Sequence, residues 1–255
     1  MSYYLNQIPI MLMALPVILI SLSVHEASHG YAAYKLGDPT AKNLGRLTLN
    51  PMKHINLYGF IAMLFFRVGW ANPVPIRARN FKNPRKGMAI SAAAGPASNL
   101  CLAIIFTILL RLTLIPLQSM ADGLYYVHGN KYWISDELSS NMLFTILSVL
   151  VVMLVLGIGI NLNLMFFNMI PIPPFDGSRV LFTFLPTDLY FKVMRYEKYF
   201  MYAFIFLLAT GIVSLPLSIL TDGVTNAFYT ATGMPEDLLT VVYSNLLNRL
   251  PKFSL

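Results

Sequence analysis

Four long apolar segments constrain this chain more than any other feature. They cover residues 8–34, 88–114, 142–170 and 200–220, and each has at least the roughly 20 residues that a helix needs to cross the hydrocarbon core of a bilayer. Across the chain, 56% of residues are hydrophobic and 11% are charged, whereas about a quarter are charged in soluble domains. We therefore predict an all-α membrane protein, a single domain over residues 1–255 with about four transmembrane helices.

A shorter apolar segment lies between the first two predicted helices. Residues 55–66 are mostly apolar, but a dozen residues are too few to span a bilayer as a helix. Irregular backbone at that depth must be buried against protein or line a wet cavity. The sequence therefore predicts a re-entrant or β-hairpin element between the first and second helices.

The basic residues are unevenly distributed. Ten of the 18 Lys and Arg residues lie between Lys35 and Lys86, where Asp38 is the only acidic residue. With four spans, fourteen basic residues fall on one side of the membrane and four on the other, and the richer side is expected to be cytoplasmic. The N-terminus is then outside. Because the basic stretch is short and flanked by membrane helices, we expect no nucleic-acid partner.

The first apolar segment contains the sequence His-Glu-Ala-Ser-His at residues 25–29. On a helix, His25 and His29 lie on one face about one turn apart, so both imidazoles can bind the same metal ion. Glu26 flanks that face and can accept a proton from water that a metal activates. A carboxylate and two histidines have a high free-energy cost inside an apolar segment, so a chain that keeps them there is expected to use them. The pattern indicates a zinc hydrolase working within a membrane, and a structural cluster of acid and histidines is the alternative.

A catalytic zinc site usually has three protein ligands and a position for water. The sequence NMIPIPPFDG, residues 168–177, follows the third apolar segment and offers Asp176. Its three prolines break the helix near the membrane face where His25 and His29 are expected, so Asp176 is predicted on a rigid, non-helical turn. Without that shared position, Asp-Gly would be an ordinary turn closing a helix.

These two motifs, on separate apolar segments and in this order, make the chain resemble the site-2 protease family of intramembrane zinc metalloproteases. Residues 69–75 (GWANPVP) and 94–99 (AGPASN) resemble the compact bacterial branch, and the likeness covers residues 20–180. Longer family members carry a PDZ domain or a C-terminal regulatory domain. The 27-residue connection at 115–141 and the 35-residue tail at 221–255 are too short for either, so neither is expected.

The resemblance implies a metalloendopeptidase of a bacterial cell membrane that hydrolyses peptide bonds in or near the transmembrane segments of single-span membrane proteins. It implies one Zn²⁺ per chain, bound by His25, His29 and Asp176 near the cytoplasmic face, with Glu26 as the general base. Asn168, eight residues before Asp176, is the candidate for binding the substrate backbone.

Three other polar residues have plainer interpretations. Asn56 stands where the compact branch often has an acidic residue, and because an amide carries no charge we expect no acidic role there. His54 could add a ligand or an acid, but its place beside Lys53 on a basic loop favours a solvated or hydrogen-bonded histidine. Asn99 is expected to be structural, with its amide hydrogen-bonded between helices.

Two other functions stay open. The same three ligands could form a transit site in a membrane metal-ion carrier, although no further charged or histidine residue lies deep in a predicted span to continue a path. An inactive relative that only binds substrates is the second alternative, and the intact Glu26 argues against it.

The charge distribution predicts that residues 115–141 and the tail after Leu220 lie outside, and that residues 35–86 and 183–198 lie inside. Single cysteines at Ser135 and Ser244, in a Cys101→Ser background, should react with a membrane-impermeant reagent only from the outside. Labelling of both positions only from the cytoplasm would reverse the orientation. Labelling on opposite sides would contradict the number of spans.

Overall fold

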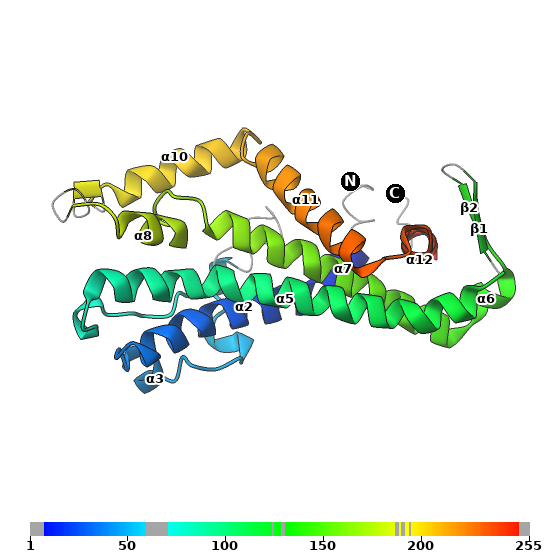
Figure 1. The fold of residues 1–255 in the computed structure, drawn as a ribbon, viewed down its shortest axis with the longest axis horizontal. Coiled ribbons are helices and arrows are strands. Elements are labelled where there is room, and N and C mark those ends of the chain that lie inside the picture. The colour runs from blue at the N-terminus through cyan, green and yellow to red at the C-terminus, as the bar shows by residue number, and fades with distance from the viewer. Residues whose placement is uncertain are drawn as a thin grey trace. The chain divides into compact units, whose positions relative to one another are not determined.

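Helices make up most of the fold (Figure 1). The computed structural model describes residues 8–59, 71–123, 125–128, 131–186, 189, 192–193 and 195–249. In chain order its elements are α2 (Ile8–Lys35), α3 (Thr40–Asn43), the short 3-10 helices η1 (Pro51–Lys53) and η2 (Ala78–Asn80), α5 (Pro84–Ala121), β1 (Tyr125–His128), β2 (Lys131–Ile134), α6 (Asp136–Ser140), α7 (Met142–Asn168), α8 (Asp176–Phe182), α10 (Glu197–Ala209), α11 (Ser214–Thr232) and α12 (Glu236–Arg249).

Three of the described helices, α2, α5 and α7, are long and apolar enough to cross a membrane. They confirm the first three predicted helical segments. The helix α2 ends at Lys35, and Gly37 follows with a φ of 108°, a conformation that glycine adopts at low cost where a helix stops. The helix α7 ends at Asn168, three residues before the first of the prolines that cannot continue it.

The fourth predicted segment, residues 200–220, is not one helix. The helix α10 ends at Ala209 and α11 begins at Ser214. Between them Gly211 has a φ of 74°, a left-handed conformation that terminates helices. With 13 residues, α10 is shorter than the roughly 20 that a span needs. The number of spans therefore stays a prediction.

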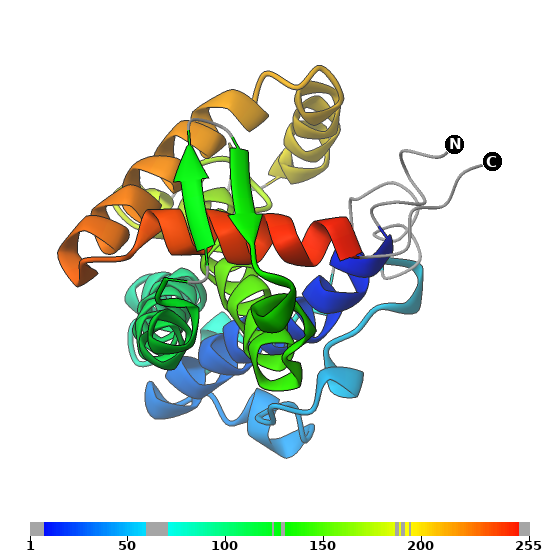
Figure 2. The same ribbon diagram turned by 90° about the vertical axis from the view of Figure 1, so that its right-hand side faces the viewer.

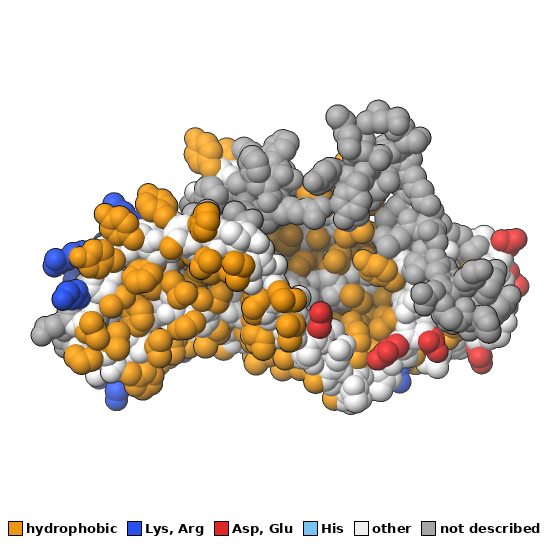
Figure 3. All heavy atoms as spheres, turned by 90° about the horizontal axis from the view of Figure 1, so that it is seen from above, with side chains coloured by type: hydrophobic (Ala, Val, Ile, Leu, Met, Phe, Trp, Pro, Cys, Tyr) orange, Lys and Arg blue, Asp and Glu red, His pale blue; other side chains and the backbone are white. Residues whose placement is uncertain are grey.

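Hydrophobic side chains cover much of the face shown in Figure 3. Large apolar residues are exposed along several helices, including Ile108 of α5, Ile146 of α7, Phe206 of α10 and Ile219 of α11. Soluble monomers rarely expose apolar area on this scale. The surface agrees with helices that contact lipid.

The chain forms two compact units, whose boundaries fall within α2, α5, α7 and α11. One unit contains residues 19–101 and 161–223, and the other contains residues 1–18, 102–160 and 224–255. The predicted single domain over residues 1–255 stays a prediction.

The second of these units contains an antiparallel hairpin. Its strands pair Tyr125 with Ile134 and His128 with Lys131, and they contact α12. Figure 2 shows the two strands in front of this helix. The helix α12 buries Leu238, Val241 and Val242 completely. This hairpin follows the second long helix, whereas the predicted element lies before it.

In the region of the predicted re-entrant or hairpin element, an isolated antiparallel bridge pairs Ile55 with Ala71. The residues between them fall largely within 60–70, which lie outside the described residues. An element between the first two long helices therefore stays a prediction.

Asp38 connects two parts of the basic segment that follows α2. Its carboxylate is fully buried and accepts hydrogen bonds from the hydroxyl and the backbone N–H of Thr40, from the backbone N–H of Arg77 and from the Asn80 side chain. Burial raises the pKa of this carboxyl, but these hydrogen bonds outweigh it and lower the pKa below its usual value of 3.8. Asp38 therefore connects residues 38–40, which precede the bridge residue Ile55, to residues 77–80, which follow its partner Ala71.

Asp38→Asn should lower the free energy of unfolding at pH 7 by about 1–3 kcal/mol, because an amide replaces the charged acceptor of these bonds. Since the pKa is lower in the folded state, this stability is fully present above about pH 4 and is lost as the pH falls through the folded-state pKa. Thermal unfolding of detergent-solubilised protein should therefore separate wild type and variant at pH 7 and less so below pH 4. Asp122→Asn, at an exposed position, is the matched control. A constant difference at all pH values would contradict the assignment.

Candidate metal centre

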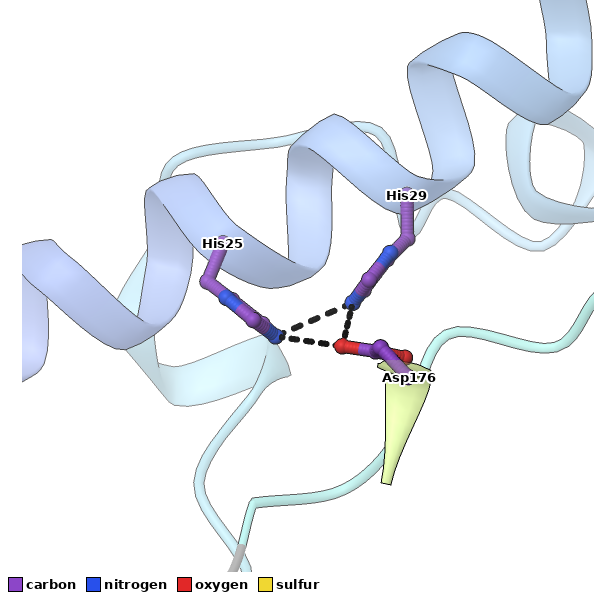
Figure 4. Close-up of side chains that lie close together, drawn as sticks. All are labelled: His25, His29 and Asp176. Atoms are coloured by element: carbon purple, nitrogen blue, oxygen red, sulfur yellow. Dashed lines mark hydrogen bonds and ion pairs between the residues drawn. The ribbon is translucent and has the colours of Figure 1, made fainter. Parts of the chain in front are cut away.

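Two histidines of α2 present their Nε2 atoms to the same point. His25 and His29 are one helical turn apart, and their Nε2 atoms are 3.0 Å from each other. Both side chains are buried, with exposures of 5% and 7%. Figure 4 shows the two rings converging from the same side of the helix.

Asp176 completes the cluster from a distant part of the sequence. Its Oδ2 atom lies 3.3 Å from Nε2 of His25 and 3.1 Å from Nε2 of His29 (Figure 4). Within the described part of the chain, these three residues form the group that could hold a metal ion. The structure thus brings together the three residues that the sequence nominated as ligands.

The local structure around Asp176 differs from the prediction in one respect. The non-helical stretch covers residues 169–175, and Asp176 itself is the first residue of α8. Gly177 allows this helix to start close to the end of α7, because a Cβ atom there would lie 2.2 Å from the carbonyl oxygen of Met169. The non-helical stretch therefore leads into a short helix, and Asp176 lies in that helix rather than in the turn.

The hydrogen bonds of the two histidines determine their tautomers. Nδ1 of His25 lies 2.6 Å from Oδ1 of Asn99, and Nδ1 of His29 lies 2.7 Å from the carbonyl oxygen of Ser91. Since a carbonyl oxygen only accepts hydrogen bonds, each Nδ1 carries a proton, and in the neutral imidazole each Nε2 then has a free lone pair. Both nitrogens that face Asp176 are thus in the form that binds metals.

The arrangement fits a tetrahedral metal ion. Bonds of about 2.0–2.1 Å in tetrahedral geometry place neighbouring ligand atoms about 3.3 Å apart, and the three observed separations are 3.0, 3.1 and 3.3 Å. Two lone pairs and a carboxylate oxygen at these distances repel each other unless a cation lies between them.

A buried chain of polar groups holds the His25 ring. Nδ2 of Asn99 donates to Oδ1 of Asn161, and Nδ2 of Asn161 donates to Oγ of Ser21. The direction of these bonds leaves Oδ1 of Asn99 facing the imidazole, where it can only accept. The chain connects α5, α7 and α2, and residues that orient a ligand in this way support metal affinity.

Sequence reasoning assigned Asn99 an interhelical hydrogen bond but missed that its partner is one of the candidate metal ligands. It also missed Ser91, which acts through its backbone. A signal for Asn99 exists, because an amide within an apolar segment must find a buried partner, and His25 is one of the few polar groups in the neighbouring apolar segments. No side-chain pattern reports a backbone carbonyl such as that of Ser91.

Gly95 of α5 makes room for both imidazoles. A Cβ atom at this position would lie 2.4 Å from Cε1 and Nε2 of His29 and 2.7 Å from Cε1 of His25. Real Cβ atoms do not approach other atoms so closely. Space for the two imidazoles thus explains the glycine in the sequence AGPASN, an explanation that the sequence alone did not provide.

The other residues singled out from the sequence are not part of the cluster of His25, His29 and Asp176. Glu26 is partly buried, and its Oε2 atom accepts a hydrogen bond of 2.8 Å from the backbone N–H of Val74. Asn168 donates from Nδ2 to the carbonyl of Leu164 within α7, and its role toward substrate stays a prediction. His54 is hydrogen-bonded, as expected, with its Nε2 2.8 Å from the carbonyl oxygen of Thr48, but it is buried rather than solvated.

Residues 13–210 match the sequence model of the family described as Peptidase family M50. The chain is 35% identical over 215 residues to "Putative zinc metalloprotease YwhC" of Bacillus subtilis, an alignment that covers 84% of this chain and 87% of the relative. It is 32% identical over 127 residues to "Putative zinc metalloprotease MJ0611" of Methanocaldococcus jannaschii, with 49% of each protein covered. No solved structure matches the chain.

Gly95→Ala should reduce zinc affinity by about 10–100-fold, the loss typical of disturbed ligand support, because the new methyl group displaces the imidazoles. The zinc content of detergent-purified protein, measured after dialysis against a graded chelator series, tests this. Gly223→Ala is the matched control, since a Cβ atom at that position of α11 would meet nothing within 4 Å. Unchanged zinc retention by Gly95→Ala would show that the two rings do not hold the metal in this arrangement.

Proposed function

The chain belongs to peptidase family M50, and we propose that it is an intramembrane zinc metalloprotease that hydrolyses peptide bonds in or near the transmembrane segments of single-span membrane proteins. The observation that carries the proposal is the convergence of Nε2 of His25, Nε2 of His29 and Oδ2 of Asp176 at 3.0–3.3 Å. The zinc metalloprotease names of two relatives support the same chemistry.

We propose that His25, His29 and Asp176 hold one Zn²⁺ ion per chain. Three protein ligands leave the fourth tetrahedral position for water or substrate, as in other catalytic zinc sites. Bound zinc supplies Lewis acidity, which makes water more acidic and polarises a carbonyl group. The Nδ1–H donors fixed by Asn99 and Ser91 keep both imidazoles in the binding tautomer.

Glu26 is the proposed general base. It follows His25 directly in α2, so its carboxylate flanks the face that carries the metal ligands. It would accept a proton from the attacking water and pass it to the leaving nitrogen of the cleaved peptide bond. One of its oxygens, Oε2, accepts the hydrogen bond from Val74, which leaves Oε1 for this proton.

The proposed substrates are single-span membrane proteins, because two of the three proposed ligands, His25 and His29, lie on α2, an apolar helix long enough to cross a bilayer. A transmembrane helix uses its carbonyl groups in its own hydrogen bonds, so a substrate must unwind before attack. Asn168, at the end of α7 beside the stretch that leads to Asp176, is the proposed contact for the unwound backbone.

The proposed location is a bacterial cell membrane, with the N-terminus outside and the active site near the cytoplasmic face. Support comes from the excess of basic residues at 35–86, which favours the cytoplasmic side for this segment. Water would then reach the site from the cytoplasm. A metal-ion carrier and an inactive relative are the alternatives that the following experiment separates from the protease.

Glu26→Gln should reduce cleavage by about 10²–10⁴-fold, the usual contribution of a general base, while zinc content stays unchanged. Wild type and variant are co-expressed with a library of tagged single-span membrane proteins, and cleaved fragments are detected. Glu137→Gln, at an exposed position of α6, should cleave like wild type, and Asp176→Ala should lose both zinc and cleavage.

Cleavage by Glu26→Gln at the wild-type rate would refute the general base. Full zinc retention by Asp176→Ala would place the third ligand elsewhere. A wild-type protein that binds zinc and cleaves no member of the library would favour the carrier or the inactive relative.

A further inference from the structure

The backbone segment beside Glu26 has few N–H groups that can donate a hydrogen bond. Residues 72–75 read Asn-Pro-Val-Pro, and neither Pro73 nor Pro75 has a backbone N–H. The N–H of Asn72 donates to the carbonyl oxygen of His54 at 2.7 Å. Among residues 73–75, only Val74 therefore has a backbone N–H, and this N–H donates to Oε2 of Glu26 at 2.8 Å.

A second contact holds this stretch from the other side. Nη2 of Arg46 lies 2.7 Å from the carbonyl oxygen of Asn72 and 3.4 Å from that of Pro73. The guanidinium thus contacts the two carbonyls that directly precede the Val74 N–H. Because Pro73 fixes its own φ, restraining these carbonyls also restrains the direction of the next N–H.

The arginine is not an ordinary surface residue. Its Nε atom is buried without a hydrogen-bond partner among the described residues, which costs free energy. A solvated arginine would avoid that cost. The loop is also tied by side chains, since Asn72 donates to the carbonyl of Ile55 and accepts from Asn56.

We propose that Arg46 is a positioning residue for hydrolysis: it holds the carbonyls of Asn72 and Pro73 so that the Val74 N–H fixes the carboxylate of Glu26. The Val74 bond occupies Oε2 and keeps Oε1 directed for proton transfer. The catalytic part of this inference rests on the proposed protease function, whereas the contact between Arg46, Val74 and Glu26 does not.

Amide hydrogen exchange at Val74 tests the contact without any substrate. The sequence contains two Pro-Val pairs, at 16–17 and 73–74, so labelling proline with ¹³C and valine with ¹⁵N yields two correlated NMR signals. Val17, within α2, serves as the internal reference. Exchange at Val74 should accelerate by at least about tenfold in Glu26→Ala and in Arg46→Met, as expected for the loss of one hydrogen bond, while Val17 is unchanged.

Kinetics test the catalytic role with a tagged single-span protein that wild type cleaves. Arg46→Met should lower kcat by at least about tenfold, with KM and zinc content unchanged, and Arg46→Lys should recover part of the loss because lysine can still donate to one carbonyl. Arg111→Met is the matched control, since Nε of Arg111 also donates to a backbone carbonyl, that of Thr232, in the other unit. If Arg46→Met does not fold, Arg46→Lys takes its place in both experiments.

Wild-type exchange at Val74 in the Arg46 variant, or wild-type kcat, would overturn the proposal. A rise in KM alone would also overturn it, because that would place Arg46 in substrate binding. If wild type neither binds zinc nor cleaves, yet Val74 loses protection as expected, the protease function fails while the contact stands.

Discussion

The candidate site is built around three electron-pair donors that face one another, two of them on buried histidines. Nε2 of His25, Nε2 of His29 and Oδ2 of Asp176 are 3.0–3.3 Å apart, and when both imidazoles are neutral, with the proton on Nδ1, no proton lies between the two Nε2 atoms. At these distances their mutual repulsion is large unless a cation is present. The other features around them have the effect of keeping them together. Asn99 and Ser91 orient the rings, and Gly95 leaves space for them.

The same features solve a problem that arises from the apolar helices. A polar side chain in such a helix has a high free-energy cost unless it is hydrogen-bonded. In this chain Ser21 of α2, Asn161 of α7 and Asn99 of α5 form a series of hydrogen bonds that ends at His25. Helix association and ligand orientation therefore use one set of contacts. A substitution at Asn161 is expected to alter the orientation of His25 in the candidate metal site, although Asn161 is not itself a candidate ligand.

The sequence predicted some elements well and others poorly, for identifiable reasons. The first three long helices followed from apolar length alone. The segment 200–220 has the same apolar length, yet Gly211 adopts a left-handed conformation that divides it, and composition cannot distinguish a glycine that stays helical from one that does not. The hairpin at 125–134 has a local signal in its sequence, two β-prone runs separated by Gly-Asn, whereas its contacts with α12 join residues about 100 positions apart and have no local signal.

The sequence by itself determined the chemistry of the centre: the i, i+4 spacing of His25 and His29, the neighbouring Glu26, and the Asp176 that follows a proline-interrupted helix end. These are local properties, set by helix geometry and by the missing N–H of proline. Only the tertiary structure decided which groups meet the ligands. The partnership of Asn99 with His25, the clearance at Gly95 and the approach of the Val74 N–H to Glu26 join residues 48–74 positions apart. Such pairings depend on how the segments pack. The identity of a side chain determines which hydrogen bonds it can donate or accept, but packing determines which partner lies within reach.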